Sequence, residues 1–335
     1  MFRSAAKKVG AVVAAATLAL SLAACGGDGA GTGGTPAGGG GGDGAPEKTE
    51  LTIGFIPVAD QAGLIRAINE GYFEAEGLKV TPQTAQGGAA ALPAMVAGDL
   101  DGVFGTYPSF LLAQQNVAKV KIVALGVGGS EDFAGVFVNP EANIADAQGL
   151  VGKKLAVNTL NNTGELSIKS VLTEQGVDPA QVEFIEMPFP DMTAALERGA
   201  IDAAWAVEPF QTQMTEAGMT KLFSNFSGKT ATAPLAGIGM TEKFVEDNPN
   251  TVAAFARAVE KANADLADDP ESVRELVPTY SQTSPEVAAK MHLPVWEAGY
   301  PTADKIAVWN DVMVELGSLQ GPVDLEEIIY SPPAQ

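Results

Sequence analysis

The pattern of hydrophobic and polar positions repeats in the middle of the chain. A helix-like run that ends at a glycine and continues into a short apolar run occurs twice, as AMVAGDLDGVF at residues 94–104 and as ALERGAIDAAW at residues 195–205. The two runs correspond at an offset of 101 positions: Gly98 with Gly199, Asp101 with Asp202, and Phe104 with Trp205. Glycine suits the left-handed residue that ends a helix, so each run predicts a helix, a turn and a strand.

The repeat extends to the segments before these runs. Short apolar runs at residues 51–56 and 153–158 predict strands, and a polar loop follows each of them. The next segments, LIRAINEGYFEAEG and LSIKSVLTEQG, predict helices, and second strands are expected at 78–84 and 182–188. Strands that alternate with helices in this way form βαβ units with parallel sheets. The pattern therefore predicts an α/β fold with two similar lobes.

Two extended stretches rich in small residues bracket the second copy of this series. We expect the segments near 130–138 and 231–238 to cross between the lobes and to form a hinge. After Thr241 the pattern is mostly helical. The predicted organisation comprises a signal peptide, a tether, a discontinuous first lobe and a second lobe, at residues 1–24, 25–48, 49–133 plus 237–335, and 134–236.

The N-terminal segment has the pattern of a secretory signal peptide. Basic residues stand at Arg3, Lys7 and Lys8, an uncharged apolar stretch follows, and the stretch ends in LAAC at residues 22–25. LAAC resembles the bacterial lipobox, which implies cleavage before Cys25 and a diacylglycerol on its thiol. The alternative is a buried structural cysteine, but the glycine-rich segment that follows opposes it. Since Cys25 is the only cysteine, no disulfide can form within the chain.

Residues 26–45 predict a flexible tether. Twelve of these twenty residues are glycine, so the segment has little side chain to bury and cannot offset the entropy of ordering. Its mean reach is about 25 Å. We therefore expect an extracytoplasmic body that is lipid-anchored to the outer face of the cell membrane through Cys25.

Composition and charge exclude several classes of function. The formal net charge of −21 opposes nucleic-acid binding, and removing residues 1–24 takes away three basic residues and no acid, which gives −21 − 3 = −24. The body has no apolar run of eighteen residues, so no multi-span membrane protein is expected. His292 is the only histidine, and no metal-ligand cluster or nucleophile motif occurs. We expect no metal, no cofactor, no enzymatic activity and a monomer.

The predicted ligand site lies where strand-end loops of the two lobes face each other. In open α/β sheets, ligands bind beyond the carboxyl ends of the strands, so two such lobes would enclose one cleft. The predicted ligand-binding residues of the first lobe are Asp60, Gln61, Gly87, Gly88, Thr106, Tyr107 and Ser109. Those of the second lobe are Asn158, Thr159, Asn162, Thr163, Phe189, Trp205 and Glu208.

The charges in these loops are all negative. The loops contain Asp60, Glu165, Asp191 and Glu208 but no lysine or arginine, which favours a small organic ligand with an amine over a simple inorganic anion. We predict that Glu208 pairs with the amine and that Trp205 or Tyr107 stacks on the ligand. Each acid also stands at a predicted helix start, where a carboxylate can cap the helix, so that alternative stays open.

Four phrases resemble one protein family. LTIGFIPVADQAGLIRAINEGYFEAEGLKV, QGGAAALPAMVAGDLD, GLVGKKLAV and GAIDAAWAVEPF are similar to phrases of the nitrate/sulfonate/taurine (NitT/TauT) group of ABC-transporter substrate-binding proteins. Gly149 stands where that group usually has a lysine. The resemblance covers about residues 51–225, and it implies a type II periplasmic-binding-protein fold with two α/β lobes, a two-crossing hinge and a ligand cleft. The family's ligand contacts come from the same loops.

The resemblance also implies a function. Such proteins capture a small molecule, here an aminosulfonate, a sulfonate or a thiamine-precursor-like compound, and deliver it to an ABC permease and its ATPase without any reaction. One alternative is an enzyme on the same fold that resembles a thiamine-pyrimidine synthase, but its active-site histidine and cysteine-rich motif are absent here. A second alternative is a ligand-sensing lipoprotein with no role in transport.

Overall fold

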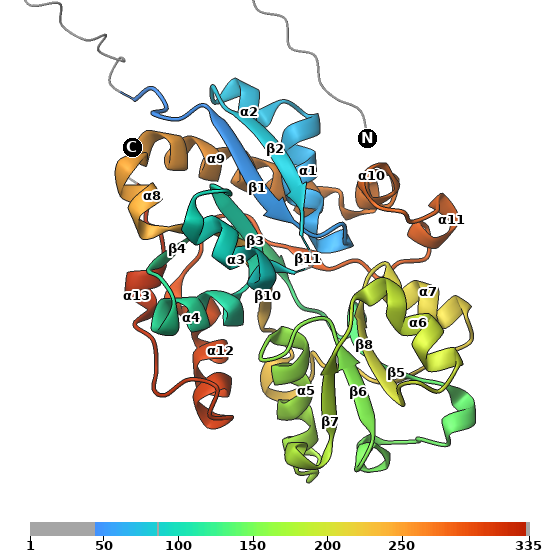
Figure 1. The fold of residues 1–335 in the computed structure, drawn as a ribbon. Coiled ribbons are helices and arrows are strands. Elements are labelled where there is room, and N and C mark those ends of the chain that lie inside the picture. The colour runs from blue at the N-terminus through green and yellow to red at the C-terminus, as the bar shows by residue number, and fades with distance from the viewer. Residues whose placement is uncertain (1–43, 86, 333–335) are drawn as a thin grey trace, which may run out of the picture. The chain divides into compact units, whose positions relative to one another are not determined.

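The computed structural model describes residues 44–85 and 87–332, and their strands form two sheets (Figure 1). The predicted signal peptide, Cys25 and most of the tether lie outside these residues. Within the described part, no helix is long and apolar enough to cross a membrane.

The first sheet contains six strands. Their order across the sheet is β11 (Val295–Trp296), β4 (Val120–Gly128), β10 (Pro234–Thr241), β3 (Gly102–Thr106), β1 (Glu50–Phe55) and β2 (Lys79–Thr84). Strand β1 is parallel to β2 and β3, whereas β10 is antiparallel to both β3 and β4. The helices of this part are α1 (Ala62–Asn69), α2 (Tyr72–Ala75), α3 (Gly88–Ala97) and α4 (Tyr107–Asn116).

The second sheet contains five strands. Their order is β7 (Glu183–Glu186), β6 (Lys154–Val157), β8 (Ala203–Val207), β5 (Ala134–Val138) and β9 (Thr220–Phe223). Strand β6 is parallel to β7 and β8, and β5 is antiparallel to β8 and β9. The helices here are α5 (Thr163–Glu174), α6 (Phe189–Glu197) and α7 (Phe210–Glu216).

The last third of the chain is mostly helical, as predicted. Its helices are α8 (Glu242–Asp247), α9 (Pro249–Asp268), α10 (Val273–Tyr280), α11 (Pro285–Ala288), α12 (Ala303–Glu315) and α13 (Leu325–Ile328). Helix α9 joins the first lobe, because the rings of Phe73 and Phe255 stack 5.1 Å apart and Asn263 Nδ2 donates to the Leu125 carbonyl at 2.8 Å. This hydrogen bond pairs the side-chain amide of Asn263, which is buried.

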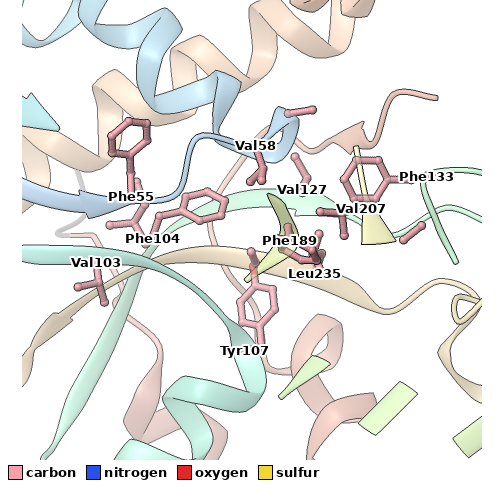
Figure 2. Close-up of a cluster of buried hydrophobic side chains, with 14 of the residues drawn as sticks. Phe55, Val58, Val103, Phe104, Tyr107, Val127, Phe133, Phe189, Val207 and Leu235 are labelled. Atoms are coloured by element: carbon pink, nitrogen blue, oxygen red, sulfur yellow. The ribbon is translucent and has the colours of Figure 1, made fainter. Parts of the chain in front are cut away.

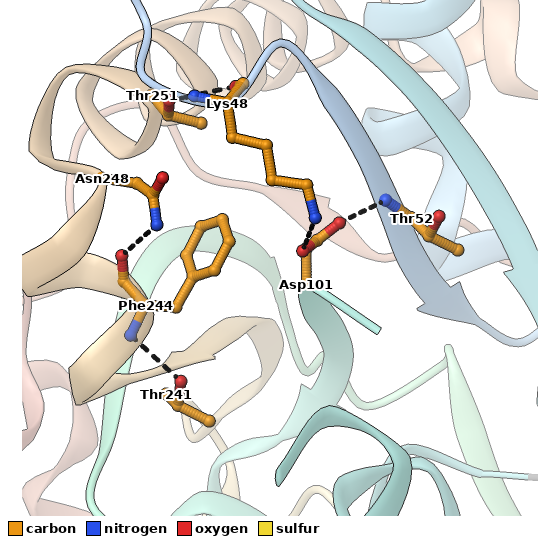
Figure 3. A network of polar contacts seen from close by, with 7 residues as sticks. All are labelled: Lys48, Thr52, Asp101, Thr241, Phe244, Asn248 and Thr251. Carbon is orange, nitrogen blue, oxygen red and sulfur yellow. Dashed lines mark hydrogen bonds and ion pairs between the residues drawn. The ribbon is translucent and has the colours of Figure 1, made fainter. Parts of the chain in front are cut away.

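The predicted repeat is confirmed in three dimensions. In each sheet three strands alternate with helices, and the helix before the third strand is followed by a left-handed glycine, at Gly98 with φ 85° or within two residues at Gly199 with φ 66°. The aspartates of the repeat tie the first of these strands to the third. Asp101 accepts the Thr52 N–H and Asp202 accepts the Lys154 N–H, both at 2.9 Å (Figure 3 shows the first).

The expectation of purely parallel sheets is wrong at β5, β10 and β11. Parallel neighbours need a crossover connection within one sheet, usually a helix. Strands β5 and β10 instead arrive directly from the other sheet, so no crossover helix sets their direction. Strand β10 is also more than a crossing, since it lies between β3 and β4 in the first sheet.

The two crossings lie side by side. The chain passes between the sheets at residues 129–133 and again at 224–233, and the Gly129 N–H donates to the Ala233 carbonyl at 3.0 Å. The Phe226 ring packs so closely on Gly129 that a Cβ there would lie 2.4 Å from the ring. Both crossings end earlier than expected, because β5 and β10 begin at 134 and 234, and the expected lobe boundary at 237 falls inside β10.

Candidate functional site

A cavity lies where the strand ends of the two sheets meet. The space between its walls is about 460 Å³ when the open solvent at its mouth is included. Both sheets contribute to the wall, which consists of Ile56, Val58, Asp60, Gln61, Gly88, Phe104, Gly105, Thr106, Asn158, Asn162, Phe189, Trp205, Val207, Leu235 and Ala236.

The topology explains this meeting. Parallel strands direct their carboxyl ends to one edge of each sheet, and wall residues come from the carboxyl-terminal parts of β3 and β8 and from the loops after β1 and β6. The close approach of α3 to β3 depends on small residues. A Cβ at Gly88 would lie 2.5 Å from the Gly105 Cα, so only glycine fits where α3 begins.

One side of the cavity is apolar and aromatic. Figure 2 shows Val58, Phe104, Phe189, Val207 and Leu235 in one cluster of buried side chains. The Phe189 ring is also tilted by 50° against the Trp205 indole, with centroids 5.5 Å apart. Apolar wall area of this kind favours a ligand with an apolar body.

A polar part of the wall comes from two adjacent residues. Asp60 is only 8% exposed, and Gln61 is fully buried. Among the described residues, Asp60 Oδ1 and both amide atoms of Gln61 have no hydrogen-bond partner. Burial raises the pKa of Asp60 to about 7. Buried polar groups are rarely unpaired, so these atoms are available to a ligand.

A third group of polar residues links the two lobes at the cavity. Asn162 is the N-cap of α5, and its Oδ1 accepts the Thr163 N–H at 2.7 Å and the Thr106 hydroxyl of the other lobe. Its Nδ2 donates to Ser109 Oγ at 2.8 Å. The amide of Asn162 is therefore already engaged by the protein.

The structure brings eight of the fourteen predicted ligand residues to the cavity wall: Asp60, Gln61, Gly88, Thr106, Asn158, Asn162, Phe189 and Trp205. Gly87 and Thr159 face each other beside the cavity, since a Cβ on the glycine would lie 3.0 Å from the threonine hydroxyl. Ser109 lines a neighbouring groove, and the fully buried Thr163 is outside the wall.

The predicted role of Tyr107 as a stacking surface is wrong. Tyr107 is the first residue of α4, and only 1% of it is exposed. It belongs to the core below the cavity (Figure 2), where burial raises the pKa of its hydroxyl.

The predicted pairing of Glu208 with a ligand amine is also wrong. Glu208 is fully buried and does not line the cavity. Its Oε1 accepts the Thr212 hydroxyl at 2.9 Å, Gln211 Nε2 at 3.1 Å and the His292 N–H at 2.9 Å, while its Oε2 accepts the Thr212 N–H at 3.2 Å. The carboxylate therefore caps α7 and ties that helix to the segment before β11.

The other two acids are separated from the cavity as well. Glu165 Oε2 accepts the Asn161 N–H at 2.6 Å, and its Oε1 pairs with Lys169 at 2.5 Å. Asp191 is exposed on the first turn of α6, in a groove that shares Ile56 and Phe189 with the cavity wall. Partners within the protein thus account for Glu165 and Glu208, but Asp60 makes no capping bond.

Sequence reasoning missed part of the wall, namely Ile56, Val58, Phe104, Gly105, Val207, Leu235 and Ala236. Two of these follow from the strand-end rule, because Val207 is the last residue of β8 and Gly105 precedes the last residue of β3. Leu235 and Ala236 were hidden in a stretch interpreted as a crossing.

Curated relatives bind small molecules. The taurine-binding periplasmic protein of Escherichia coli (strain K12) is 27% identical over 228 residues, which cover 67% of this chain and 69% of that protein. A nitrate/nitrite binding protein, NrtA, of Synechococcus elongatus is 27% identical over 264 residues, and these cover 69% of this chain and 58% of that protein.

A solved structure shows the same fold. The alkanesulfonate-binding protein SsuA from Xanthomonas axonopodis pv. citri, bound to MOPS, matches with a TM-score of 0.72 at 17% identity and covers 85% of this chain and 99% of that one. The predicted periplasmic-binding-protein fold is thereby confirmed. A family model described as the NMT1-like family matches residues 44–280, which is more than half of the chain. This protein therefore belongs to the NMT1-like family.

Proposed function

We propose that the protein is an extracytoplasmic solute-binding protein that captures a small organic ligand between its two sheets and delivers it to an ABC importer. The observation that carries this proposal is the cavity of about 460 Å³, whose wall comes from both sheets. A site divided between two lobes couples ligand binding to their closure. The printed functions of the taurine-binding and nitrate/nitrite-binding relatives support the same function.

The ligand belongs to the small organic molecules that the sequence predicted, an aminosulfonate, a sulfonate or a thiamine-precursor-like compound. The apolar wall with Trp205 and Phe189 would contact its body, and the unpaired atoms of Asp60 and Gln61 would bind its polar end. The partners are the permease and the ATPase of the importer. The body acts as a monomer, held at the outer face of the cell membrane by a lipid on Cys25.

The proposal is tested by blocking the cavity. Asn158 is a half-buried wall residue in the loop after β6, so Asn158→Trp should fill the space without disturbing the core. The matched control is Leu160→Trp, which adds the same indole to the same loop at an exposed position outside the wall.

We expect thermal-shift screening of candidate solutes to give a stabilised wild-type protein, and calorimetry to give a loss of affinity of at least tenfold for Asn158→Trp. Leu160→Trp should bind as the wild type does. Equal affinity for the two variants would show that solutes bind elsewhere. Turnover of a bound solute would instead favour the enzyme alternative.

A further inference from the structure

We propose that the cavity selects a ligand whose polar end is a protonated nitrogen, bound by Asp60 and Gln61. This inference rests on the proposed function and specifies the chemistry of its ligand. It differs from the pairing expected at Glu208, because a different carboxylate is free.

The first observation is that, within residues 44–85 and 87–332, side-chain atoms of Asp60 and Gln61 have no hydrogen-bond partner. Asp60 Oδ1 is buried without a hydrogen-bond partner in the described part of the chain, and the two amide atoms of the adjacent Gln61 are unpaired too. Neither side chain makes a capping hydrogen bond, although Gln61 is the N-cap residue of α1. Ionising a buried carboxyl group whose Oδ1 has no partner among the described residues is costly, and a charged N–H donor from the ligand would reduce that cost.

The second observation is that the part of the cavity wall that the structure describes contains an acid and no basic side chain. Asp60 is the one ionisable side chain among the described residues that form the cavity wall. The basic side chains on the nearby helices are engaged elsewhere: Arg66 Nη1 contacts Glu70 at 3.5 Å and its Nη2 donates to Ser272 at 2.5 Å, while Lys169 pairs with Glu165. The net charge of −24 after cleavage would also attract cations to the protein.

The helix starts define the opposite end of the ligand. Helices α3, α4 and α5 begin at the cavity, next to Gly88, Thr106 and Asn162. Their N-termini carry partial positive charge, which suits an oxygen acceptor on the ligand. The ligand can therefore carry an oxygen-bearing group there, but these partial charges provide no cation to pair with the carboxyl group of Asp60.

The test compares ligands that differ only at the polar end. Each pair has the same body with an amine or a hydroxyl, beginning with taurine against isethionate and benzylamine against benzyl alcohol, and benzenesulfonate serves as an anion. Affinities are measured by calorimetry for the wild type, for Asp60→Asn and for Asp304→Asn. The last variant removes the same charge from the exposed first turn of α12, outside the cavity and its neighbouring grooves.

We expect an amine to bind at least tenfold more tightly than its hydroxyl partner. Asp60→Asn should weaken amine binding by roughly ten- to a hundredfold, since a hydrogen bond to a charged group is lost. Asp60→Asn keeps the shape of the side chain, and its melting curve verifies that it is folded. Asp304→Asn should have the affinity of the wild type.

Two results would overturn the inference while the proposed function stands. One is a hydroxyl compound or benzenesulfonate that binds as tightly as the amines, or binds when no amine does. The other is an amine affinity that Asp60→Asn leaves within twofold. If no compound of the panel binds, both the inference and the proposed function fail.

Discussion

Three acids that look alike in the sequence have different roles in the structure. Asp60, Glu165 and Glu208 all stand near helix starts, but only Asp60 combines burial with a free carboxylate at the cavity. The carboxyl group of Glu208 accepts hydrogen bonds from several donors, which include the N–H of His292, 84 positions away in the chain. Distant partners of this kind decide the role of a carboxylate, and local sequence does not reveal them.

At this scale we predict that Asp60 makes the stability of the protein depend on pH. Its pKa rises from 3.8 to about 7 on folding, so between these values the folded state binds more protons than the unfolded state. Stability should therefore fall as the pH rises from about 4 to about 7, and Asp60→Asn should remove this contribution. The free energy of unfolding of Asp60→Asn should rise relative to that of the wild type by up to about 1.4 kcal/mol for each pH unit in this range.

Urea unfolding of the ligand-free protein at several pH values measures this difference. Tyr280 is the other titratable group near the carboxylate, and it stays neutral because burial raises its pKa well above 10. Asp191→Asn should follow the wild type at every pH. Parallel stability curves for Asp60→Asn and the wild type would mean that solvent reaches Asp60.

At the scale of elements, the repeated units were predictable because they depend on local signals. Glycine at the helix end, aspartate before the third strand and the alternation of helix and strand are all visible in the sequence. The direction of β5 and β10 was not predictable, since it depends on strands that enter from the other sheet. The apolar half of the cavity wall was missed for a related reason. Its residues look like ordinary strand residues until both sheets are assembled.

One helix start controls the shape of the cavity. Gly164 lies in the first turn of α5, and a Cβ there would lie 2.3 Å from the Trp205 ring. We predict that Gly164→Ala forces the indole to move, destabilises the protein by about 1–3 kcal/mol and weakens ligand binding. Denaturant unfolding and near-UV circular dichroism measure the two structural effects. Gly321→Ala, where a Cβ would meet open space, should change stability by less than about 0.5 kcal/mol.

At the scale of the whole molecule, the acidic body is expected to work from a fixed position at the membrane. The sequence predicts a lipid on Cys25 followed by a glycine-rich tether whose reach is about 25 Å. This tether would keep the cavity close to an importer in the same membrane. A bound solute could then reach the permease without diffusion of its carrier through the bulk medium.

We predict that Cys25→Ser abolishes anchoring. The wild type should fractionate with membranes and incorporate labelled palmitate, whereas the variant should be released or remain an uncut precursor. Cys25 is the only cysteine, so the label has one thiol to modify. A Cys25→Ser/Thr32→Cys variant restores a thiol seven positions later and should not restore anchoring. Unchanged membrane association of Cys25→Ser would contradict the prediction.

The adjacency of the two crossings limits how the lobes can move. Two independent connections far apart would resist bending, and a single one would allow twisting in any direction. Here the chain crosses twice through neighbouring segments that the bond from Gly129 to Ala233 holds together. We expect such a joint to leave one soft rotational degree of freedom, about the line through both segments. Every ligand that enters the cavity would then meet the same approach path of one lobe toward the other, whatever its own shape.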